Sequence, residues 1–420
     1  MDPPKGMKDF NVEYEILRKK IVSVIEEEFQ KYGFEPILTP IIEYWDILKG
    51  KYGEEAENKL IWKFKLSFSD REYALKYDNT VPLARFYAKY RPSLPFKRYV
   101  IDRVFRYDEP QKGRYREFWQ ADADIIGSPY PEADAEIIEL FDKIFEKLGF
   151  KDFYIYLNDR ILIENIFKYF GISFKDVYTI IDKLDKIGLD GVIKELSKKF
   201  DSKTIEKIVS IIGLKGQEAI DEISKIKREE ISDRLNLLYN IIDLSNSKKV
   251  IYNPALVRGL DYYTGMIFEI VLKNFQISLA GGGRYDNLIE LFSKSKVPAV
   301  GGSIGINRLL DLGIENKIFD LNNKTILDLA IIYLDQNLYV EALKLARKLR
   351  DLGLRVYLDV SRKKFKNQIE YVVSKNIRYI IIVGRKEIEE KKLILQDRLE
   401  KKKYDIDINE INKIIEIINS

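Results

Sequence analysis

The sequence contains no cysteine and no histidine among its 420 residues. Without cysteine there is no disulfide, no thiolate nucleophile and no zinc site with thiolate ligands. Without histidine there is no Ser-His-Asp triad, no Cys-His pair, no imidazole metal ligand and no ordinary general base at neutral pH. Any enzymatic chemistry must therefore come from arginine, lysine, carboxylates, tyrosine and bound metal. Adenylyl and phosphoryl transfer suit these groups, because there the protein mainly positions reactants and neutralises charge.

Long hydrophobic runs and a strong net charge are also missing. No apolar run is long enough to cross a membrane, and the N-terminal segment MDPPKGMKDF does not have the pattern of a signal peptide. We therefore predict a cytoplasmic protein with no membrane partner. The net charge of +4 permits nucleic-acid binding without arguing for it. A chain of 420 residues that is 46% hydrophobic predicts two or three domains with substantial cores.

One stretch, residues 98–124, carries an ordered row of polar side chains. Two segments of alternating residues flank a polar loop at 108–113, which predicts a β-hairpin. In the second segment, a period of two places on one face Arg114, Arg116, Phe118, Gln120, Asp122 and Asp124. Such a row is suited to a polyanion at its arginine end and a cationic group at its carboxylate end. A solvated sheet face with paired charges is the alternative, and bare alternation alone favours it.

The rest of the chain predicts a mixture of helices and strands. Hydrophobic spacing predicts a helix at 12–32, a strand at 35–43 that contains two prolines, strands near 62–68 and 72–77, and a helix at 81–90. Asp78 and Thr80 precede or begin that helix, where small oxygen-bearing side chains commonly serve only as caps. Helical patterns dominate residues 161–245. Strands and helices alternate over 328–383, which predicts a small parallel or mixed sheet.

Glycines mark two further segments in the second half of the chain. Residues 279–286 read LAGGGRYD, and three consecutive glycines let a backbone lie directly against a ligand. A loop is the ordinary explanation for such a run. Residues 300–310, VGGSIGINRLL, predict a strand that leads into a helix.

Several of these segments resemble the motifs of class II aminoacyl-tRNA synthetases. The stretch FRYDEPQKGRYREFWQADADIIG resembles motif 2, in the form that this motif takes in histidyl-tRNA synthetases. Residues 257–269 and 279–286 resemble the two motifs that distinguish that family from other class II enzymes. Residues 300–310 resemble motif 3, with Ser303 where a glycine is usual, and the N-terminal helix and strand up to Pro40 resemble motif 1. Asp124 resembles the residue of archaeal and eukaryotic members of that family, because bacterial members often have Glu at this position.

This resemblance implies an α/β fold of the α+β kind. We expect a class II antiparallel sheet with flanking helices, a helical insertion and a C-terminal βαβαβ anticodon-binding domain. The expected boundaries are 1–160 for the first part of the catalytic domain, 161–245 for the insertion, 246–320 for the second catalytic part and 325–420 for the anticodon-binding domain.

The resemblance also implies a reaction, its partners and its site residues. L-histidine would react with ATP to give histidyl-adenylate, and histidine would then pass to the 3′ end of tRNA(His), in a homodimer formed through motif 1. Arg258 and Arg106 are the expected catalytic residues. Mg²⁺ would be carried by the phosphates of ATP, with Glu269 as a candidate ligand. The expected ATP-binding residues are Arg106, Arg114, Phe118 and Arg308, and the expected histidine-binding residues are Asp78, Thr80, Gln120, Asp124, Arg258, Tyr262 and Tyr263.

The main alternative is a non-catalytic relative. The regulatory subunit of ATP phosphoribosyltransferase shares the catalytic-domain fold, but it usually lacks the C-terminal domain and the full set of motif arginines. This chain keeps both. A tRNA-sensing module of the kind attached to some stress kinases is a further alternative, and the sequence contains no kinase segment.

Overall fold

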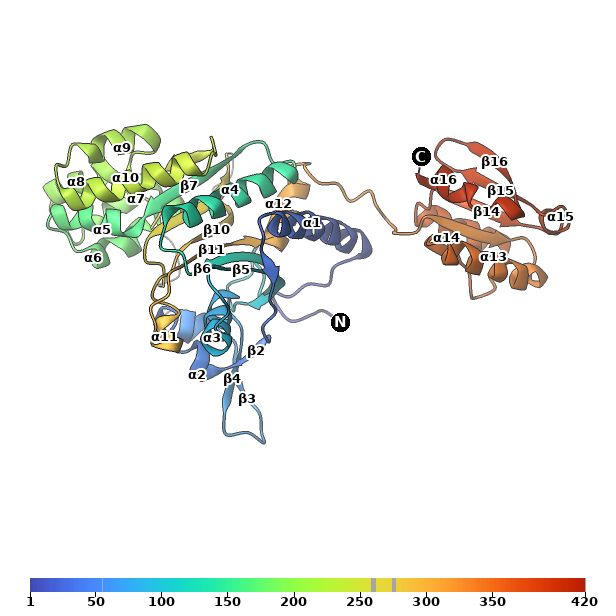
Figure 1. The fold of residues 1–420 in the computed structure, drawn as a ribbon, viewed down its shortest axis with the longest axis horizontal. Helices are drawn as coiled ribbons and strands as arrows, with labels where there is room; N and C mark the ends of the chain where they lie inside the picture. Colours follow the sequence, from blue (N-terminus) through green and yellow to red (C-terminus); the bar gives the residue numbers. More distant parts are fainter. Residues whose placement is uncertain (55, 258–261, 274–276, 420) are drawn as a thin grey trace. The chain divides into compact units, whose positions relative to one another are not determined.

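The computed structural model describes residues 1–54, 56–257, 262–273 and 277–419 (Figure 1). The chain forms two compact units. One comprises residues 1–9 and 20–318, and the other comprises residues 10–19 and 319–420. Within the described residues, no helix combines the length and the apolar character needed to cross a membrane.

An eight-stranded sheet lies at the centre of the first unit, in the order β1-β5-β6-β11-β10-β9-β7-β8. All neighbours from β5 to β7 pair antiparallel, and the outer pairs β1-β5 and β7-β8 are parallel. This antiparallel core confirms the predicted fold class. The strands are β1 (Glu35–Pro36), β5 (Phe96–Phe105), β6 (Glu117–Ile126), β7 (Phe153–Asp159), β8 (Val250–Tyr252), β9 (Met266–Leu272), β10 (Ser278–Arg284) and β11 (Ala299–Gly305).

The predicted continuous strand over residues 35–43 is wrong. The chain leaves the large sheet after Pro36 and enters a separate three-stranded sheet, β2-β4-β3. Proline has no N–H to donate to a ladder, so β1 is confined to the edge of the large sheet. The small sheet consists of β2 (Ile42–Tyr44), β3 (Lys63–Lys65) and β4 (Glu72–Leu75), and beside it lie α2 (Trp45–Leu48), the π-helical turn η1 (Ala56–Leu60) and α3 (Thr80–Tyr90).

One helix and two strands pack closely in the large sheet because two strand residues lack side chains. A Cβ on Gly302 of β11 would lie 2.8 Å from the ring of Phe141 in α4, and a Cβ on Gly282 of β10 would lie 2.5 Å from the Cα of Gly302. Glycine at these two positions therefore allows the helix and strands to pack directly. The helices of this part are α1 (Val12–Lys31) from residue 20 onward, α4 (Pro131–Lys147), α11 (Glu290–Ser293) and α12 (Ile306–Glu315).

The predicted hairpin of residues 98–124 is present, but its loop is longer than predicted. β5 ends at Phe105 and β6 begins at Glu117, so Arg114 and Arg116 precede the strand. The guanidinium of Arg116 lies 3.6 Å from the centre of the Tyr107 ring, and its Nε donates to the backbone oxygen of Asp108 at 3.0 Å. The alternating row is therefore correct from Phe118 to Asp124 and wrong for Arg116.

Residues between β7 and β8 are helical, as the sequence predicts. The last of these helices, α10, is tied to the end of β7, because the Nε of Arg234 donates to Oδ1 of Asp159 at 2.9 Å. The helices are α5 (Arg160–Tyr169), α6 (Phe174–Ile181), α7 (Leu184–Leu196), α8 (Ser202–Ile212), α9 (Gly216–Ser224) and α10 (Glu229–Leu244).

The second unit contains a five-stranded mixed sheet in the order β13-β12-β14-β15-β16. Its strands are β12 (Leu329–Tyr333), β13 (Val356–Leu358), β14 (Tyr379–Val383), β15 (Lys392–Asp397) and β16 (Lys402–Asp407), and its helices are η2 (Gln336–Leu338), α13 (Tyr339–Asp351), α14 (Phe365–Ser374), α15 (Arg385–Glu389), η3 (Ile408–Glu410) and α16 (Lys413–Asn419). The βαβαβ prediction is correct for β12 to β14. The antiparallel hairpin β15-β16 lies in a lysine-rich segment that the hydrophobic pattern did not single out.

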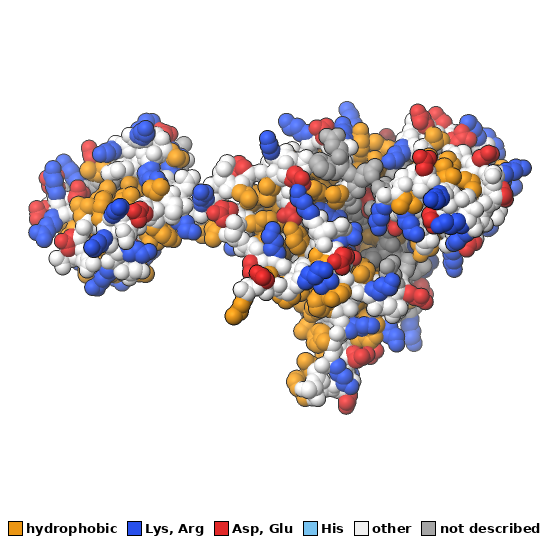
Figure 2. Space-filling model, turned by 180° about the vertical axis from the view of Figure 1, so that it is seen from behind, with side chains coloured by type: hydrophobic (Ala, Val, Ile, Leu, Met, Phe, Trp, Pro, Cys, Tyr) orange, Lys and Arg blue, Asp and Glu red, His pale blue; other side chains and the backbone are white. Residues whose placement is uncertain are grey.

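Charged side chains of both signs are mixed over the surface. Figure 2 shows Lys and Arg side chains interspersed with Asp and Glu over the face that it presents. This distribution agrees with the small net charge of +4.

Candidate active site

A cavity of about 340 Å³ lies over the middle of the large sheet, where two adjacent strands lack large side chains. In the ladders, Asp122 pairs with Ser303 and Asp124 pairs with Gly301, and these β11 residues pair in turn with Gly281 and Gly283 of β10. Directly paired residues point to the same face of a sheet. The floor of the cavity is therefore formed by glycine and serine, with carboxylates along the β6 side.

Gly301 is required by the side chain of Asp124. A Cβ at Gly301 would lie 2.1 Å from Oδ1 of Asp124 and 2.8 Å from the backbone oxygen of Ala123. Real Cβ contacts are not this short. The missing side chain at Gly301 thus makes room for the carboxylate that lies across it.

The structure gathers almost all of the predicted site residues around this one cavity. Arg258 lies outside the described residues, so the structure gives no account of it. The predicted residues that line the cavity are Asp78, Thr80, Arg106, Arg114, Phe118, Gln120, Asp124, Tyr262, Tyr263, Glu269 and Arg308.

Three guanidinium groups lie at one end of the cavity. Arg308 at the start of α12 donates from Nε to the backbone oxygen of Gly113 at 2.9 Å and from Nη1 to that of Ser278 at 2.8 Å. Burial and the neighbouring cations Arg114 and Arg106 lower the pKa of Arg308. Cations that are buried together in this way are stabilised by an anion, so this end suits a polyphosphate.

An aromatic ring lies beside these arginines. The guanidinium of Arg106 is 5.4 Å from the ring centre of Phe118 and 4.5 Å from that of Tyr77. Its Nε donates to the backbone oxygen of Tyr77 at 3.0 Å, which fixes the side chain. Phe118 thus offers a flat surface at the phosphate end of the cavity.

Asp78, which interacts with the nearby Arg106, is held by two tyrosines and a helix terminus. The hydroxyl groups of Tyr52 and Tyr262 donate to its Oδ1 and Oδ2 at 3.0 and 3.1 Å. The backbone N–H groups of Thr80 and Val81 also donate to Oδ1, so Asp78 does cap α3 as the simpler interpretation predicted. Burial raises the pKa of Asp78, although the N–H of Val81 and the cation Arg106 oppose this effect.

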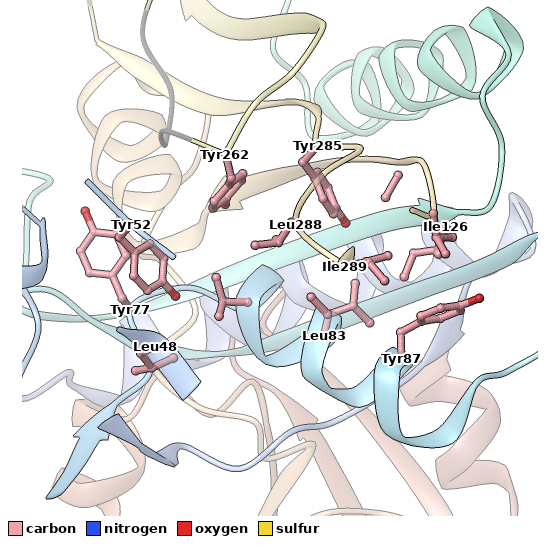
Figure 3. Close-up of a cluster of buried hydrophobic side chains, with 14 of the residues drawn as sticks. Leu48, Tyr52, Tyr77, Leu83, Tyr87, Ile126, Tyr262, Tyr285, Leu288 and Ile289 are labelled. Carbon is pink, nitrogen blue, oxygen red and sulfur yellow. The ribbon is translucent and has the colours of Figure 1, made fainter. Parts of the chain in front are cut away.

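The tyrosines that hold this carboxylate belong to a buried apolar cluster. Figure 3 shows Tyr262 and Tyr285 near Leu288 and Ile289, and Tyr52 beside Tyr77, all within one cluster of buried side chains. Because the rings are fixed by packing, their hydroxyl groups present a preformed set of donors to the carboxylates of the site.

Gln120 contributes an unpaired acceptor. Its Nε2 donates to Oγ of Ser303 at 2.7 Å, and its Oε1 is buried without a hydrogen-bond partner in the described part of the chain. Buried carbonyl oxygens are rarely left unpaired, so this atom is a candidate to accept from a bound ligand.

Sequence reasoning missed two residues that surround Asp124. Arg98 is buried on β5 directly opposite Asp124, with its Nη2 2.9 Å from Oδ2 of Asp124. The hydroxyl of Tyr285 donates to the other oxygen, Oδ1. Tyr285 belongs to the glycine-rich motif, which is a usable signal. Arg98 becomes meaningful only when the register of β5 against β6 is known.

One cavity over an antiparallel sheet brings together an arginine of the β5–β6 hairpin and an arginine at the junction of β11 and α12, with a buried carboxylate. This arrangement defines a class II aminoacyl-tRNA synthetase. Comparison with known proteins is more specific. The family described as histidyl-tRNA synthetase matches residues 6–309, and the anticodon binding domain matches residues 328–417. The chain belongs to the histidyl-tRNA synthetase family.

The relatives match over their full length. The histidine–tRNA ligase of Nanoarchaeum equitans is 52% identical over 419 residues, which cover 99% of each chain. That of Aeropyrum pernix is 44% identical over 426 residues, covering 99% of this chain and 97% of the relative. The crystal structure of histidyl-tRNA synthetase from Nostoc sp. PCC 7120 has a TM-score of 0.85 at 27% identity, with 99% of both chains covered.

Proposed function

We propose that this protein is a histidine–tRNA ligase that activates L-histidine with ATP and then transfers histidine to the 3′ end of tRNA(His). The observation that carries the proposal is a single cavity lined by three arginines and by buried carboxylates: Arg106, Arg114 and Arg308, and Asp78, Asp122 and Asp124. Full-length similarity to histidine–tRNA ligases favours this activity over that of a regulatory subunit. A cytoplasmic location, where tRNA is charged, is part of the same proposal.

The first step needs no general base, which agrees with the absence of histidine from the chain. The ionised carboxylate of the amino acid attacks the α-phosphate, a new P–O bond forms, and the bond to the β-phosphate oxygen breaks to release pyrophosphate. The requirement is positive charge on the phosphates, which arginine supplies without ever losing its proton. Arg106 is assigned to the α-phosphate, Arg114 and Arg308 to the β- and γ-phosphates, and Phe118 to the adenine ring.

The amino-acid subsite is assigned to the carboxylate end. Asp78, Thr80 and Gln120 would accept hydrogen bonds from the α-ammonium group, for which the unpaired Oε1 of Gln120 is well suited. Tyr262 holds Asp78 in place. Asp124 and Tyr263 are assigned to the imidazole. Burial and the nearby carboxylates of Asp124 and Asp78 raise the pKa of Tyr263, so its hydroxyl stays protonated at neutral pH.

Mg²⁺ is proposed to accompany ATP. In sites of this kind Mg²⁺ takes one or two carboxylates together with substrate phosphates, and it retains water. Glu269 and Asp108 line the cavity on the side of the arginines, so carboxylates are present where the phosphates would lie. Among the described residues, no group of three or more acidic side chains is placed to hold a metal ion. The ion would neutralise phosphate charge.

A homodimer is proposed through the segment that resembles motif 1. Apolar side chains remain exposed after β1 and along β2, including Leu38 at 73%, Ile42 at 50% and Tyr44 at 43% exposure. Clusters of exposed apolar residues at a sheet edge are typical of subunit interfaces.

The test of the proposed function is ATP–pyrophosphate exchange in the absence of tRNA, measured with each proteinogenic amino acid in turn. Exchange that depends on histidine alone is expected. Exchange with a different amino acid would contradict the assignment of Asp124 and Tyr263. Histidine binding without any exchange would favour a regulatory or sensing relative.

The Arg258→Ala variant is expected to lose exchange by about 1000-fold while still binding histidine, because the family places this arginine at the α-phosphate. Exchange rate and calorimetric histidine binding are the two measurements. Lys273→Ala is a suitable control, since Lys273 lies on the surface, where it pairs with the exposed Asp152 at 3.4 Å, and is outside the cavity lining. Near wild-type exchange by Arg258→Ala would show that the role does not transfer to this chain.

A further inference from the structure

Asp122 is a buried carboxylate of the cavity to which the proposed function gives no role. It is 2% exposed and lines the cavity between Gln120 and Asp124 on β6. Its Oδ1 has no hydrogen-bond partner within the part of the chain that the structure describes. Folded proteins seldom bury a carboxylate oxygen without a partner, because the lost hydration is not replaced. The unpaired oxygen therefore points to a ligand group that donates to it.

Asp122 differs from Asp124 in how it is satisfied by the protein. Asp124 accepts a hydrogen bond from the hydroxyl of Tyr285 at Oδ1 and forms an ion pair with Arg98 through Oδ2, which, like Oδ1 of Asp122, has no hydrogen-bond partner among the described residues. Arg98 is also the cation that acts on Asp122. One guanidinium therefore serves two buried carboxylates, and the pair retains one uncompensated negative charge.

Among the described residues, Arg98 is the cation that acts on Asp122, whereas Arg106 of the same cavity acts on Asp78 and Tyr263. The charged and titratable groups on the elements around Asp122 are, among the described residues, Arg98 on β5, Asp124 on β6, Asp78 before α3, Tyr263 before β9 and Tyr285 after β10. On β11 its ladder partner is the uncharged Ser303. Burial raises the pKa of Asp122 to about 6; Arg98 opposes this effect, Asp124 adds to it, and the side chains of Ser303 and Asn79 oppose it by hydrogen bonding. A cationic ligand group would restore the balance of charge.

The spacing of the two carboxylates suits the two N–H groups of an imidazolium ring. Residues two apart on a strand have Cα atoms about 6.6 Å apart and side chains on the same face. Hydrogen bonds of about 2.8 Å from both ring N–H groups reach acceptors about 7 Å apart. Neutral imidazole has a single N–H, whereas imidazolium has two.

We propose that histidine is bound as the imidazolium, with Asp122 accepting from one ring N–H and Asp124 from the other. The inference rests on the proposed function, since it concerns histidine as the substrate. Free histidine is mainly neutral at its ring above about pH 7, so binding there takes up one proton from solvent, which resides on a ring nitrogen. The negative charges of Asp122 and Asp124 are then balanced by the positive charges of Arg98 and of the imidazolium ring.

The direct experiment is nitrogen-15 NMR of ring-labelled L-histidine bound to an excess of enzyme at about pH 8. Both ring nitrogens are expected to carry a proton in the complex. Because the chain has no histidine, the bound ligand is the only imidazole present. A ring with one unprotonated nitrogen in the wild-type complex would overturn the proposal. This measurement uses the unmodified enzyme, so it does not depend on any variant folding.

The Asp122→Asn variant tests which carboxylate is responsible. It is expected to bind a neutral ring with one unprotonated nitrogen and to raise the KM for histidine by at least about 30-fold, with kcat nearly unchanged. Glu117→Gln is a matched control, because Glu117 lies on the same strand, pairs with the exposed Arg103 and is outside the cavity lining. Retention of the imidazolium in Asp122→Asn would overturn the role of Asp122.

These outcomes separate the inference from the proposed function. An enzyme that shows histidine-dependent exchange but holds a neutral ring would refute the inference alone. Absence of histidine-dependent exchange would refute the function on which it rests. Calorimetry in buffers of different ionisation enthalpy provides an independent readout, since proton uptake is expected for the wild type and Glu117→Gln and not for Asp122→Asn.

Discussion

Replacing Arg106 with glutamine is expected to lower histidine-dependent ATP–pyrophosphate exchange by about 1000-fold, which corresponds to roughly 4 kcal/mol of transition-state stabilisation. Arg106 is fixed by its hydrogen bond to Tyr77 and lies at the phosphate end of the cavity beside Phe118. Because the guanidinium is already oriented and partly desolvated, its charge would act on the α-phosphate without reorganisation if the proposed assignment is correct. Glutamine keeps a hydrogen-bond donor but loses the charge. The loss should therefore fall mainly on kcat.

Arg103→Gln provides the matched control for this variant. Arg103 lies on the same hairpin, three residues earlier, and pairs with Glu117 at 2.8 Å in a largely exposed position. Exposed ion pairs contribute little to stability, so this variant should keep its exchange rate and its melting temperature. Equal effects of the two substitutions would mean that charge on the hairpin in general, rather than Arg106 in the cavity, determines the rate.

The Gly301→Ala variant is expected to raise the KM for histidine by about 100-fold and to lower the melting temperature by about 5 °C. A single methyl group at this position would lie 2.1 Å from Oδ1 and 2.6 Å from Cγ of Asp124, and 2.8 Å from the backbone oxygen of Ala123. The backbone contact cannot be relieved by a change of rotamer. Asp124 would be displaced from Arg98 and Tyr285, and the imidazole subsite would lose its shape.

Gly305→Ala on the same strand is the control. It distinguishes a steric clash at Gly301 from a general effect of replacing glycine by alanine. A Cβ at Gly305 would have its nearest neighbours at 3.9 Å, and the backbone there does not need a positive φ. Its melting temperature should equal that of the wild type. An equal decrease in melting temperature for both variants would contradict the steric explanation, and an unchanged KM for Gly301→Ala would contradict the role of Asp124.

Much of the site was predictable because its residues lie in short segments with a regular period. Alternation along the second segment of the hairpin predicts that Phe118, Gln120 and Asp124 share one face, and the cavity that all three line confirms this. The same alternation wrongly placed Arg116 on that face. The hairpin loop extends to this residue, and a contact with Tyr107 determines the direction of its side chain. Periodicity applies only within the strand, and loop length depends on contacts that a local pattern does not contain.

Other parts of the site depend on residues that are distant in sequence. Tyr52 and Tyr262 meet at Asp78 only because packing in one apolar cluster brings their rings together. The division of the predicted strand 35–43 between two sheets likewise follows from the missing N–H of proline and from the partners available on each side.

The sequence by itself determined the chemistry and the order of the groups that carry it. Absence of histidine and cysteine restricted the enzyme to arginine and carboxylate chemistry, and the motif order indicated the family. Tertiary structure alone decided the strand register. That register sets Arg98 opposite Asp124 and Gly301 beneath it, and leaves Asp122 without a protein partner for one oxygen among the residues that the structure describes. Register is fixed by the burial of whole sheet faces against distant helices, and no local pattern of residues contains that information.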